Sequence, residues 1–235
     1  MRSPTNRQAA ETRSLQTQLT PNPISKEHFL RMMLELPAGD FGAYLFDCDG
    51  TIVDSMPLHY KAWKQALSEY GCEFPEKLFY EWGGKPIHEI VSTLNQMHGL
   101  HMPVDKIAEY KEGLYFAQLP TLKVIPETLE HIEAQYGKIP FAVVSGGRRN
   151  SVEHSLTTVD LIDKFPVIVG AGDYKRSKPA PDPFLIAAEI LGVPPEHCLV
   201  FEDTDLGIQS ATAAGMASVL VPGPLERAAA GTTKA

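Results

Sequence analysis

The stretch Ala43–Thr51 reads AYLFDCDGT, and it decides the fold. Four apolar residues run directly into a polar turn that contains two aspartates and a glycine. A short apolar run that stops abruptly at polar residues is typical of a strand buried in a parallel sheet. Asp47 and Asp49 would then lie at the carboxyl end of that strand, where open parallel sheets bind their ligands.

More apolar runs of this kind follow in the second half of the chain. Each ends in a polar, glycine or proline residue: Phe141–Val144 before Ser145, Val167–Val169 before Gly170, Leu199–Phe201 before Glu202, and Ser218–Val221 before Pro222. Helical patterns alternate with them, at Pro126–Tyr136, Asn150–Thr158, Pro181–Leu191 and Asp205–Ala214. The alternation predicts an α/β fold, a Rossmann-like doubly wound parallel sheet covered by helices on both faces. Asp205 is predicted to cap the last helix, and Gly215 to end it.

About ninety residues separate the first apolar run from the second. A single crossover between parallel strands needs only on the order of a dozen residues or more. The intervening segment carries three helical patterns, Pro57–Tyr70, Pro86–His98 and Val104–Leu119. We therefore expect a helical cap domain at residues 55–122, inserted into a core domain made of residues 24–54 and 123–235.

The first stretch, residues 1–23, is rich in Ser, Thr, Gln and Arg and contains no apolar segment. It is predicted to be a disordered tail, with an organellar transit peptide or a cloning remnant as alternatives. A short helical pattern follows at Ile24–Leu36, with Ser25 in the position of an N-cap.

The composition argues against several classes of protein. A formal net charge of −8 disfavours general nucleic-acid binding, and no apolar run approaches the ~18 residues that span a bilayer. Three scattered cysteines suit neither a zinc site nor a disulfide framework. We expect a cytoplasmic protein that binds a small molecule, and the oligomeric state stays open between a monomer and a small homo-oligomer.

Polar side chains that suit phosphate chemistry follow the apolar runs. They are Asp47, Asp49, Ser145, Glu202 and Asp203, and Lys178 precedes a helix. In their order and spacing, these residues resemble the four motifs of the haloacid dehalogenase-like phosphatases, over roughly residues 41–221. The stretch Ser177–Asp182, taken with Phe201–Gly215, is similar to the subgroup that contains β-phosphoglucomutase and small sugar phosphatases.

The resemblance implies a cap of the C1 type and gives the two aspartates catalytic roles. Asp47 would be the nucleophile, because a carboxylate with a reference pKa near ~3.9 is already ionised at neutral pH. Asp49 would protonate the leaving alkoxide, and would then deprotonate the water that breaks down the aspartyl-phosphate. The approach of an anionic nucleophile to an anionic phosphate calls for a cation.

Magnesium is the expected cofactor. Asp47 and Asp203 would hold Mg²⁺, which prefers one or two carboxylates together with water and phosphate oxygens. The resemblance implies that the main-chain carbonyl of Asp49 is a further ligand. For Glu202, direct ligation and a supporting role beside the metal are equal alternatives.

The phosphoryl group itself needs donors and positive charge. Ser145 would donate from its hydroxyl, and Lys178 would supply the charge. Gly146 lies in the turn after Ser145, where a missing side chain allows either a close approach to a ligand or a tight turn.

Three further residues are candidates for contacts with the rest of the substrate. His59 and Lys111 match positions that members of the subgroup use near the substrate, although a lone His on a helix is as often simply packed. Arg148 follows the turn after Ser145 and would meet a distal negative charge. Trp63 and Trp82 are predicted to pack within the cap.

One departure separates hydrolysis from phosphoryl shuttling. Mutases of the subgroup carry an Arg shortly after the glycine that Gly84 matches, and Ile87 occupies that place here. We therefore expect a magnesium-dependent phosphatase for a small phosphorylated metabolite, with a sugar phosphate as one candidate. A phosphosugar mutase of the β-phosphoglucomutase type is the first alternative, and a non-catalytic binding protein is the second.

Overall fold

A computed structural model of the chain describes residues 34–224, 226 and 227. The tail predicted over residues 1–23 lies outside the described residues, and so does most of the helix predicted over Ile24–Leu36. The last three residues of that helical pattern, 34–36, are described and are not helical. Within the described residues, no helix combines the length and apolar character that crossing a membrane requires.

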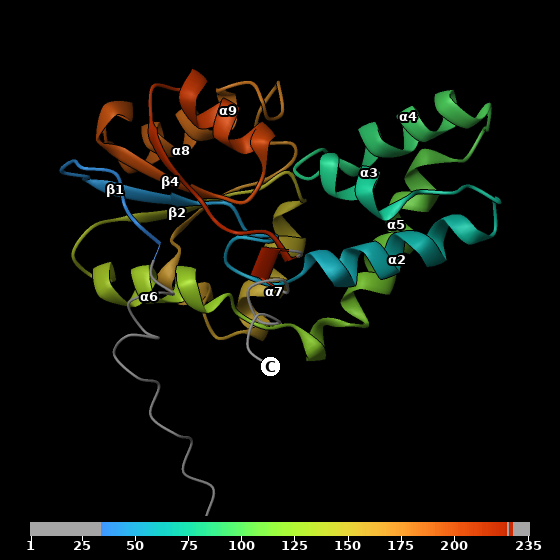
Figure 1. The fold of residues 1–235 in the computed structure, drawn as a ribbon, viewed down its shortest axis with the longest axis horizontal. Coiled ribbons are helices and arrows are strands. Elements are labelled where there is room, and N and C mark those ends of the chain that lie inside the picture. Colours follow the sequence, from blue (N-terminus) through green and yellow to red (C-terminus); the bar gives the residue numbers. More distant parts are fainter. Residues whose placement is uncertain (1–33, 225, 228–235) are drawn as a thin grey trace, which may run out of the picture. The chain divides into compact units, whose positions relative to one another are not determined.

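The predicted strands form one parallel sheet within this part of the chain (Figure 1). They are β1 (Ala43–Phe46), β2 (Phe141–Val144), β3 (Val167–Val169), β4 (Cys198–Glu202) and β5 (Ala217–Leu220). Their spatial order is β3-β2-β1-β4-β5. The chain therefore builds the sheet outward in one direction from β1, and then crosses to the other side of β1 for β4. Ligands of open α/β sheets bind at such a reversal of strand order.

Helices cover both faces of the sheet, as predicted for a doubly wound fold. One face, which carries Phe46 and Phe141, packs against α6 (Pro126–Gln135) and α7 (Arg149–Thr158). The opposite face, which carries Leu45 and Val144, packs against α8 (Asp182–Leu191) and α9 (Asp205–Ala213). Figure 1 shows these two pairs of helices on opposite sides of the strands. All the side chains of β1, β2 and β4 are buried, which explains their unbroken apolar pattern.

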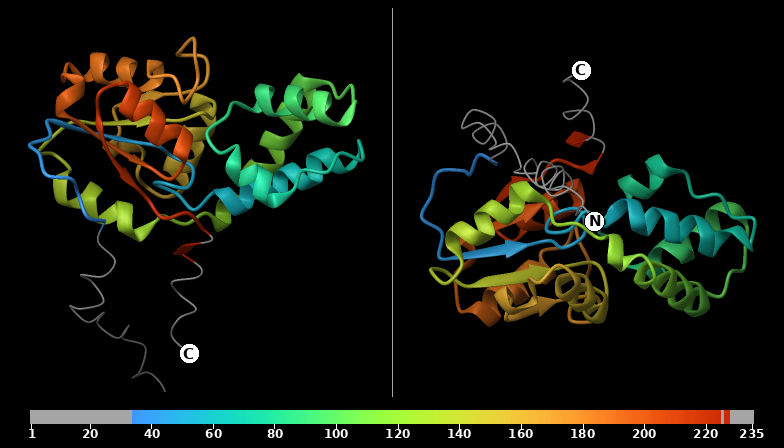
Figure 2. Two further views of the ribbon diagram at one scale, coloured as in Figure 1. Left: turned by 45° about the horizontal axis from the view of Figure 1, so that its top comes forward. Right: turned by 90° about the horizontal axis from the view of Figure 1, so that it is seen from below.

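Four helices follow β1 before the chain reaches α6, and we call them the cap helices: α2 (Met56–Ser68), α3 (Glu76–Glu81), α4 (Ile87–His98) and α5 (Val104–Phe116). They share an apolar cluster of their own, in which Trp63 is 2% exposed, so its predicted packing role is confirmed. Trp82 packs against the same cluster. The two views in Figure 2 show the cap helices grouped beside one end of the sheet. The boundaries predicted at residues 55 and 122 remain predictions.

The sequence patterns missed or misjudged three local features. Helix α3 was not predicted, because six residues are too short for a helical period to show. Helix α5 ends at Phe116 rather than Leu119, and a separate 3₁₀ turn follows at Leu119–Thr121. The N-cap of α9 is Thr204, whose hydroxyl accepts a bond from the Gly207 amide, so the prediction that Asp205 caps this helix was wrong. The predicted helix end at Gly215 is confirmed by its φ of +74°.

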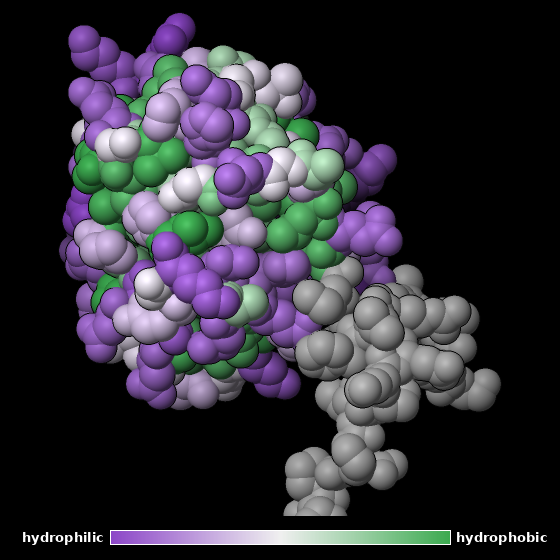
Figure 3. Space-filling model, turned by 90° about the vertical axis from the view of Figure 1, so that its left-hand side faces the viewer, coloured by the Kyte–Doolittle hydropathy of each residue, from purple (hydrophilic) through white to green (hydrophobic). Residues whose placement is uncertain are grey.

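Hydrophilic and hydrophobic residues are interspersed on the face of the molecule that Figure 3 presents. Large hydrophobic side chains that stay exposed in the described part of the chain are spread over several elements, and only Leu185 and Ile190 share one, α8: Leu36, Tyr70, Met97, Tyr110, Tyr136, Leu185, Ile190 and Leu220. Single exposed hydrophobic residues of this kind are ordinary on a protein surface.

Candidate active site

The carboxyl ends of the central strands bring the predicted residues together. The Asp47 amide donates to the Phe201 carbonyl at 2.9 Å, which holds the end of β1 beside β4. The Ser145 amide donates to the Val169 carbonyl at 2.9 Å in the same way, at the end of β2. The parallel register thus places one acidic and one hydroxyl side chain on the same edge as the acidic pair that ends β4.

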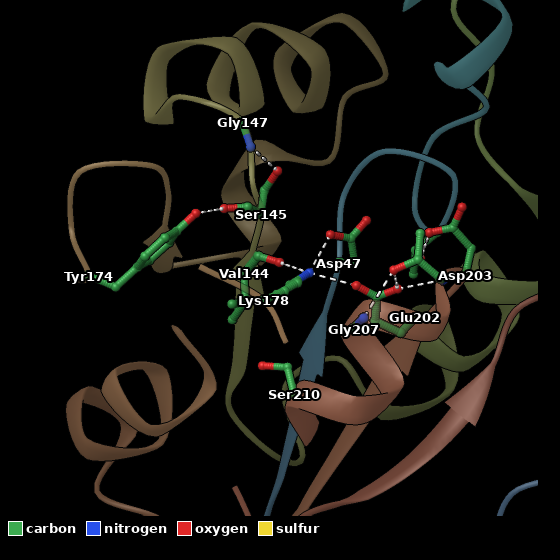
Figure 4. Close-up of polar contacts among 12 residues, drawn as sticks. Asp47, Val144, Ser145, Gly147, Tyr174, Lys178, Glu202, Asp203, Gly207 and Ser210 are labelled. Carbon is green, nitrogen blue, oxygen red and sulfur yellow. Dashed lines mark hydrogen bonds and ion pairs between the residues drawn. The ribbon is translucent and has the colours of Figure 1, made fainter. Parts of the chain in front are cut away.

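Lys178 is the centre of the charged cluster at this edge (Figure 4). Its ammonium group donates to Asp47 Oδ1 at 2.7 Å, to Glu202 Oε1 at 2.6 Å and to the Val144 carbonyl at 3.0 Å. Burial alone would lower the pKa of Lys178, but Asp47 and Glu202 together raise it, so the ammonium keeps its charge. Only 3% of Lys178 is exposed, so it is not an ordinary surface lysine.

Asp203 adds a third carboxylate to the cluster. Its Oδ1 accepts a bond from the Thr51 hydroxyl at 3.3 Å. Burial, reinforced by Glu202 and Asp47, raises the pKa of Asp203 well above its ordinary range. Burial also raises the pKa of Asp47 to about 8, with Lys178 acting in the opposite direction and Glu202 in the same one. One lysine is thus too little positive charge for three carboxylates.

This excess of negative charge fits a divalent cation. Over residues 34–224, 226 and 227, no three His, Cys, Asp or Glu side chains form a metal cage by themselves. Magnesium does not require such a cage, because it takes one or two carboxylates and completes its shell with water and phosphate oxygens. A side chain at Gly50 would overlap the Asp203 carboxylate, so a glycine is needed where the turn of β1 passes this group.

Both carboxylate oxygens of Glu202 already have protein partners. Oε1 accepts from Lys178, and Oε2 accepts from the amide and the hydroxyl of Thr204 at 2.7 and 2.8 Å. A side chain at Gly207 would overlap the Glu202 carboxyl group. These contacts favour the alternative in which Glu202 orients Lys178 rather than binds a metal.

Asp49 lies at the start of a chain of hydrogen bonds that leads into the cap helices. Its Oδ1 accepts from the Ser55 hydroxyl at 2.6 Å and lies 3.0 Å from His59 Nε2. His59 Nδ1 lies 2.8 Å from the Lys111 ammonium, which can only donate. His59 is therefore the neutral tautomer that donates from Nε2 to Asp49. Its ring stacks on that of Tyr115, with 3.8 Å between the ring centroids.

The pKa values in this chain agree with that assignment. Burial, followed by the charge of Lys111, lowers the pKa of His59 below its ordinary value. Burial would raise the pKa of Asp49, but His59 and Ser55 outweigh it and bring the pKa down to about 2. Asp49 is therefore a stabilised carboxylate in this arrangement.

The turn after Ser145 is tight, and the cap passes directly over it. Ser145 Oγ accepts from the Gly147 amide at 2.9 Å. A side chain at Gly146 would overlap the carbonyl oxygen of Gly84, which lies between α3 and α4. The backbone that closely approaches Gly146 in this structure is that of Gly84, whereas the approach to a ligand stays a prediction.

A cavity of about 80 Å³ lies between the cap helices and the strand ends. The predicted residues that line it are Asp47, Asp49, His59, Lys111, Ser145 and Gly146. Arg148 does not line this cavity: it is exposed, and its Nη2 lies 3.4 Å from His88 Nε2 beside a neighbouring hollow. Ile87 does line the cavity.

Two buried polar residues of the cavity lining were missed from the sequence. Glu112 of α5 and Ser151 of α7 both line the cavity and are buried. The buried stripe of α5 reads Ile107, Ala108, Lys111, Glu112 and Tyr115. Two adjacent charged residues within an otherwise apolar stripe could have indicated a functional pair, but only Lys111 was singled out from the sequence.

Comparison with known protein families shows which family the chain, and with it this site, belongs to. A model of the haloacid dehalogenase-like hydrolases matches residues 44–221, which is most of the chain. The chain belongs to this family. The resemblance seen in the strand-end motifs is thereby confirmed, and so is the fold expected from it, a parallel α/β sheet with an inserted helical region.

Several relatives of this hydrolase are phosphatases or mutases whose names refer to phosphorylated sugars. The fructose-1-phosphate phosphatase YqaB of Escherichia coli is 34% identical, over 76% of this chain and 95% of that protein. The 6-phosphogluconate phosphatase of E. coli is 32% identical, over 74% of this chain and 79% of that protein. The crystal structure of β-phosphoglucomutase from Clostridium difficile is 25% identical with a TM-score of 0.70, over 80% of this chain and 87% of that one. The enzyme class predicted from the sequence, a phosphatase of phosphoric monoesters, is confirmed.

Proposed function

We propose that this hydrolase removes the phosphate group from a small phosphorylated sugar through an aspartyl-phosphate on Asp47, with Mg²⁺ as its cofactor. The observation that carries the proposal is that Asp47, Asp49 and Ser145 line the same cavity, with the Lys178 ammonium bonded to Asp47. This set supplies a nucleophile, a proton carrier, a hydroxyl donor and a fixed positive charge.

In the first half of the reaction, a carboxylate oxygen of Asp47 attacks phosphorus, and the bond from phosphorus to the sugar oxygen breaks. Lys178 holds Asp47 in position and offsets the negative charge at the strand ends. Asp49 gives the leaving oxygen its proton. An anionic phosphate beside Asp49 raises the pKa of its carboxyl group, which favours the protonated form in this step.

In the second half, water attacks the phosphorus of the aspartyl-phosphate, and Asp49 takes the proton from that water. The contacts from Ser55 and His59 stabilise the carboxylate form of Asp49 that this step needs. Inorganic phosphate then leaves, and Asp47 is regenerated.

The divalent metal implied by the family would be held by Asp47, Asp203 and the main-chain carbonyl of Asp49. It supplies charge neutralisation between the carboxylates and the phosphate oxygens. The excess of buried carboxylates over lysine at this edge supports that assignment.

A sugar phosphate is the substrate class that the relatives support. Their names specify fructose 1-phosphate and 6-phosphogluconate as substrates. The mutase alternative rests on the related β-phosphoglucomutase structure and on Lys85, which lines the cavity. Against it, Ile87 contributes an aliphatic side chain to the cavity, and an aliphatic group gives a second phosphate no charge-assisted bond.

The test is product analysis with purified protein, Mg²⁺ and a panel of sugar monophosphates that includes β-glucose 1-phosphate. We expect inorganic phosphate to appear in step with the dephosphorylated sugar, without a bisphosphate activator. Isomerisation to glucose 6-phosphate that depends on a bisphosphate primer and releases little free phosphate would instead establish the mutase.

A further inference from the structure

Glu112 has a carboxylate oxygen that no group of the described chain satisfies. Only 8% of the residue is exposed, and it lines the cavity from α5. Its Oε1 accepts from Lys111 at 3.0 Å, whereas Oε2 is buried and has no hydrogen-bond partner among the described residues. A buried carboxylate oxygen without a donor is unfavourable, so this position suits a donor that arrives with a ligand.

The surroundings of Glu112 keep it ionised. Burial would raise its pKa, but the charge of Lys111 and the hydrogen bond from it outweigh burial, and the pKa lies below the ordinary value. Ser151 of α7 lines the cavity from the core side, and its hydroxyl lies near enough to the Glu112 carboxylate to favour the ionised form, without reaching hydrogen-bond geometry to Oε2. Glu112 therefore presents a fixed negative charge at the far end of the chain of bonds that begins at Asp49.

The lysine beside it does not offer a free cation to a ligand. The Lys111 ammonium is 3% exposed and bonds to His59 and Glu112. The other lysine that lines the cavity is Lys85, and its ammonium lies over the Trp82 ring, 4.7 Å from the centroid. Much of the remaining cap lining is apolar or aromatic: Met56, Trp63, Phe79, Trp82, Ile87 and Ile90.

We propose that Glu112 is a specificity residue: it accepts a hydrogen bond from a hydroxyl of the substrate and rejects substrates with a negative charge at that place. The preferred substrates are then sugar or polyol monophosphates whose remaining groups are uncharged hydroxyls. Sugar acid phosphates and bisphosphates are poor substrates, because like charges repel and a carboxylate cannot donate to Oε2. This inference rests on the proposed phosphatase activity and adds the substrate class within it.

A matched pair of substrates tests the idea on the wild-type enzyme. Sorbitol 6-phosphate and 6-phosphogluconate differ only at C1, where one has a CH₂OH group and the other a carboxylate. We expect kcat/KM with Mg²⁺ to favour sorbitol 6-phosphate by about tenfold or more. A wild-type preference for 6-phosphogluconate overturns the inference, whatever the variants do. Absence of turnover with every phosphomonoester in the panel overturns the proposed phosphatase itself, which is a separate result.

The variant Glu112→Gln tests whether Glu112 itself causes this substrate preference. Its amide keeps the shape, loses the charge and can donate to a substrate carboxylate, so the ratio of kcat/KM values should shift toward 6-phosphogluconate by about tenfold or more. Glu109→Gln is the matched control, since Glu109 lies exposed on the same helix, and its ratio should equal that of the wild type. Equal losses on both substrates in Glu112→Gln would show that Glu112 only neutralises Lys111, and would overturn the inference. The ratio cancels any general loss of folded enzyme.

Discussion

In the described part of the chain, buried charges gather in two regions, at the strand ends and in the cap helices, and they are balanced differently. At the strand ends, Lys178 bonds to Asp47 and Glu202, and Asp203 adds a third carboxylate nearby, which leaves an excess of negative charge among the described residues. In the cap, Lys111 meets one carboxylate, Glu112, and one neutral ring, His59, so the charges cancel.

The imbalance at the strand ends suits a site that acts on an anion only with the help of a bound cation. The balanced cap suits recognition, because it adds little net charge and still offers a directed acceptor. The two regions meet at Asp49, which lies in the turn after β1 and whose carboxylate contacts Ser55 and His59 at the start of the first cap helix. Variants in each region should therefore fail in different ways.

Removal of divalent ions should have the largest effect. In excess chelator, phosphate release should fall to background, Mg²⁺ should restore it, and Ca²⁺ should restore it poorly because it takes more ligands at longer distances. Asp203→Ala should raise the Mg²⁺ concentration needed for half-maximal activity or abolish activity, whereas Glu112→Gln should leave that concentration unchanged. Full activity in excess chelator would show that the reaction does not need a divalent metal.

Loss of the Lys178 cation should have the next largest effect. Lys178→Met leaves Asp47 and Glu202 buried without their partner, so we expect a loss of about 3–5 kcal/mol in the free energy of unfolding and a fall in kcat on the order of 10²–10³. Adding Glu202→Gln should recover part of the stability and none of the activity. Lys111→Met should reduce both quantities less, because only one carboxylate loses its partner. Equal effects of the two lysine variants, measured by urea unfolding and phosphate release, would contradict the comparison.

Contact between the two regions is tested at Gly146. In Gly146→Ala, the new methyl group meets the Gly84 carbonyl, which is backbone and yields only if the cap moves. We expect the protein to fold and kcat/KM to fall by about ten- to a hundredfold, because a displaced cap misplaces the substrate. Gly113→Ala is the control within α5: a methyl group there meets nothing within 4 Å, and stability should rise by about 0.5–1 kcal/mol. Wild-type kcat/KM in Gly146→Ala would show that this close approach is unimportant for the reaction.

The smallest effect is expected at Tyr115, which joins α5 to α7. Its hydroxyl donates to Ser155 Oγ at 2.8 Å, and the Ser155 hydroxyl donates in turn to the Ser151 carbonyl. Tyr115→Phe keeps the ring stacked on His59 and loses this one bond, so urea unfolding should report a loss of about 0.5–1.5 kcal/mol. A hundredfold loss of kcat with unchanged stability would instead place the Tyr115 hydroxyl in the chemistry.

The same comparison explains what the sequence was able to predict. The strand ends were predictable because a buried parallel strand reads as an apolar run, and its first polar residue, such as Asp47, must lie at the edge that binds ligands. Lys178 and Asp203 followed from motif spacing. The sheet and the helices on its two faces followed from the alternation of strand and helix patterns.

The cap was less predictable, for physical reasons. A charged residue on an amphipathic helix usually faces water, so Glu112 carried little signal until α7 was placed against α5. Arg148 was predicted to meet the substrate from its distance along the chain to Ser145, but the start of α7 leaves its side chain exposed beside His88. The positions of both side chains depend on contacts between elements far apart in sequence.

The most direct test of the central claim is whether Asp47 becomes phosphorylated. The enzyme would be mixed with the best sugar monophosphate and Mg²⁺, quenched in acid during turnover, digested and examined by mass spectrometry. We predict that the peptide containing Asp47 gains the mass of one phosphoryl group, that the modification maps to this residue, and that Asp47→Asn neither gains it nor releases phosphate. Phosphate release by Asp47→Asn at a rate near that of the wild type, or a phosphoryl group on another residue, would contradict the account.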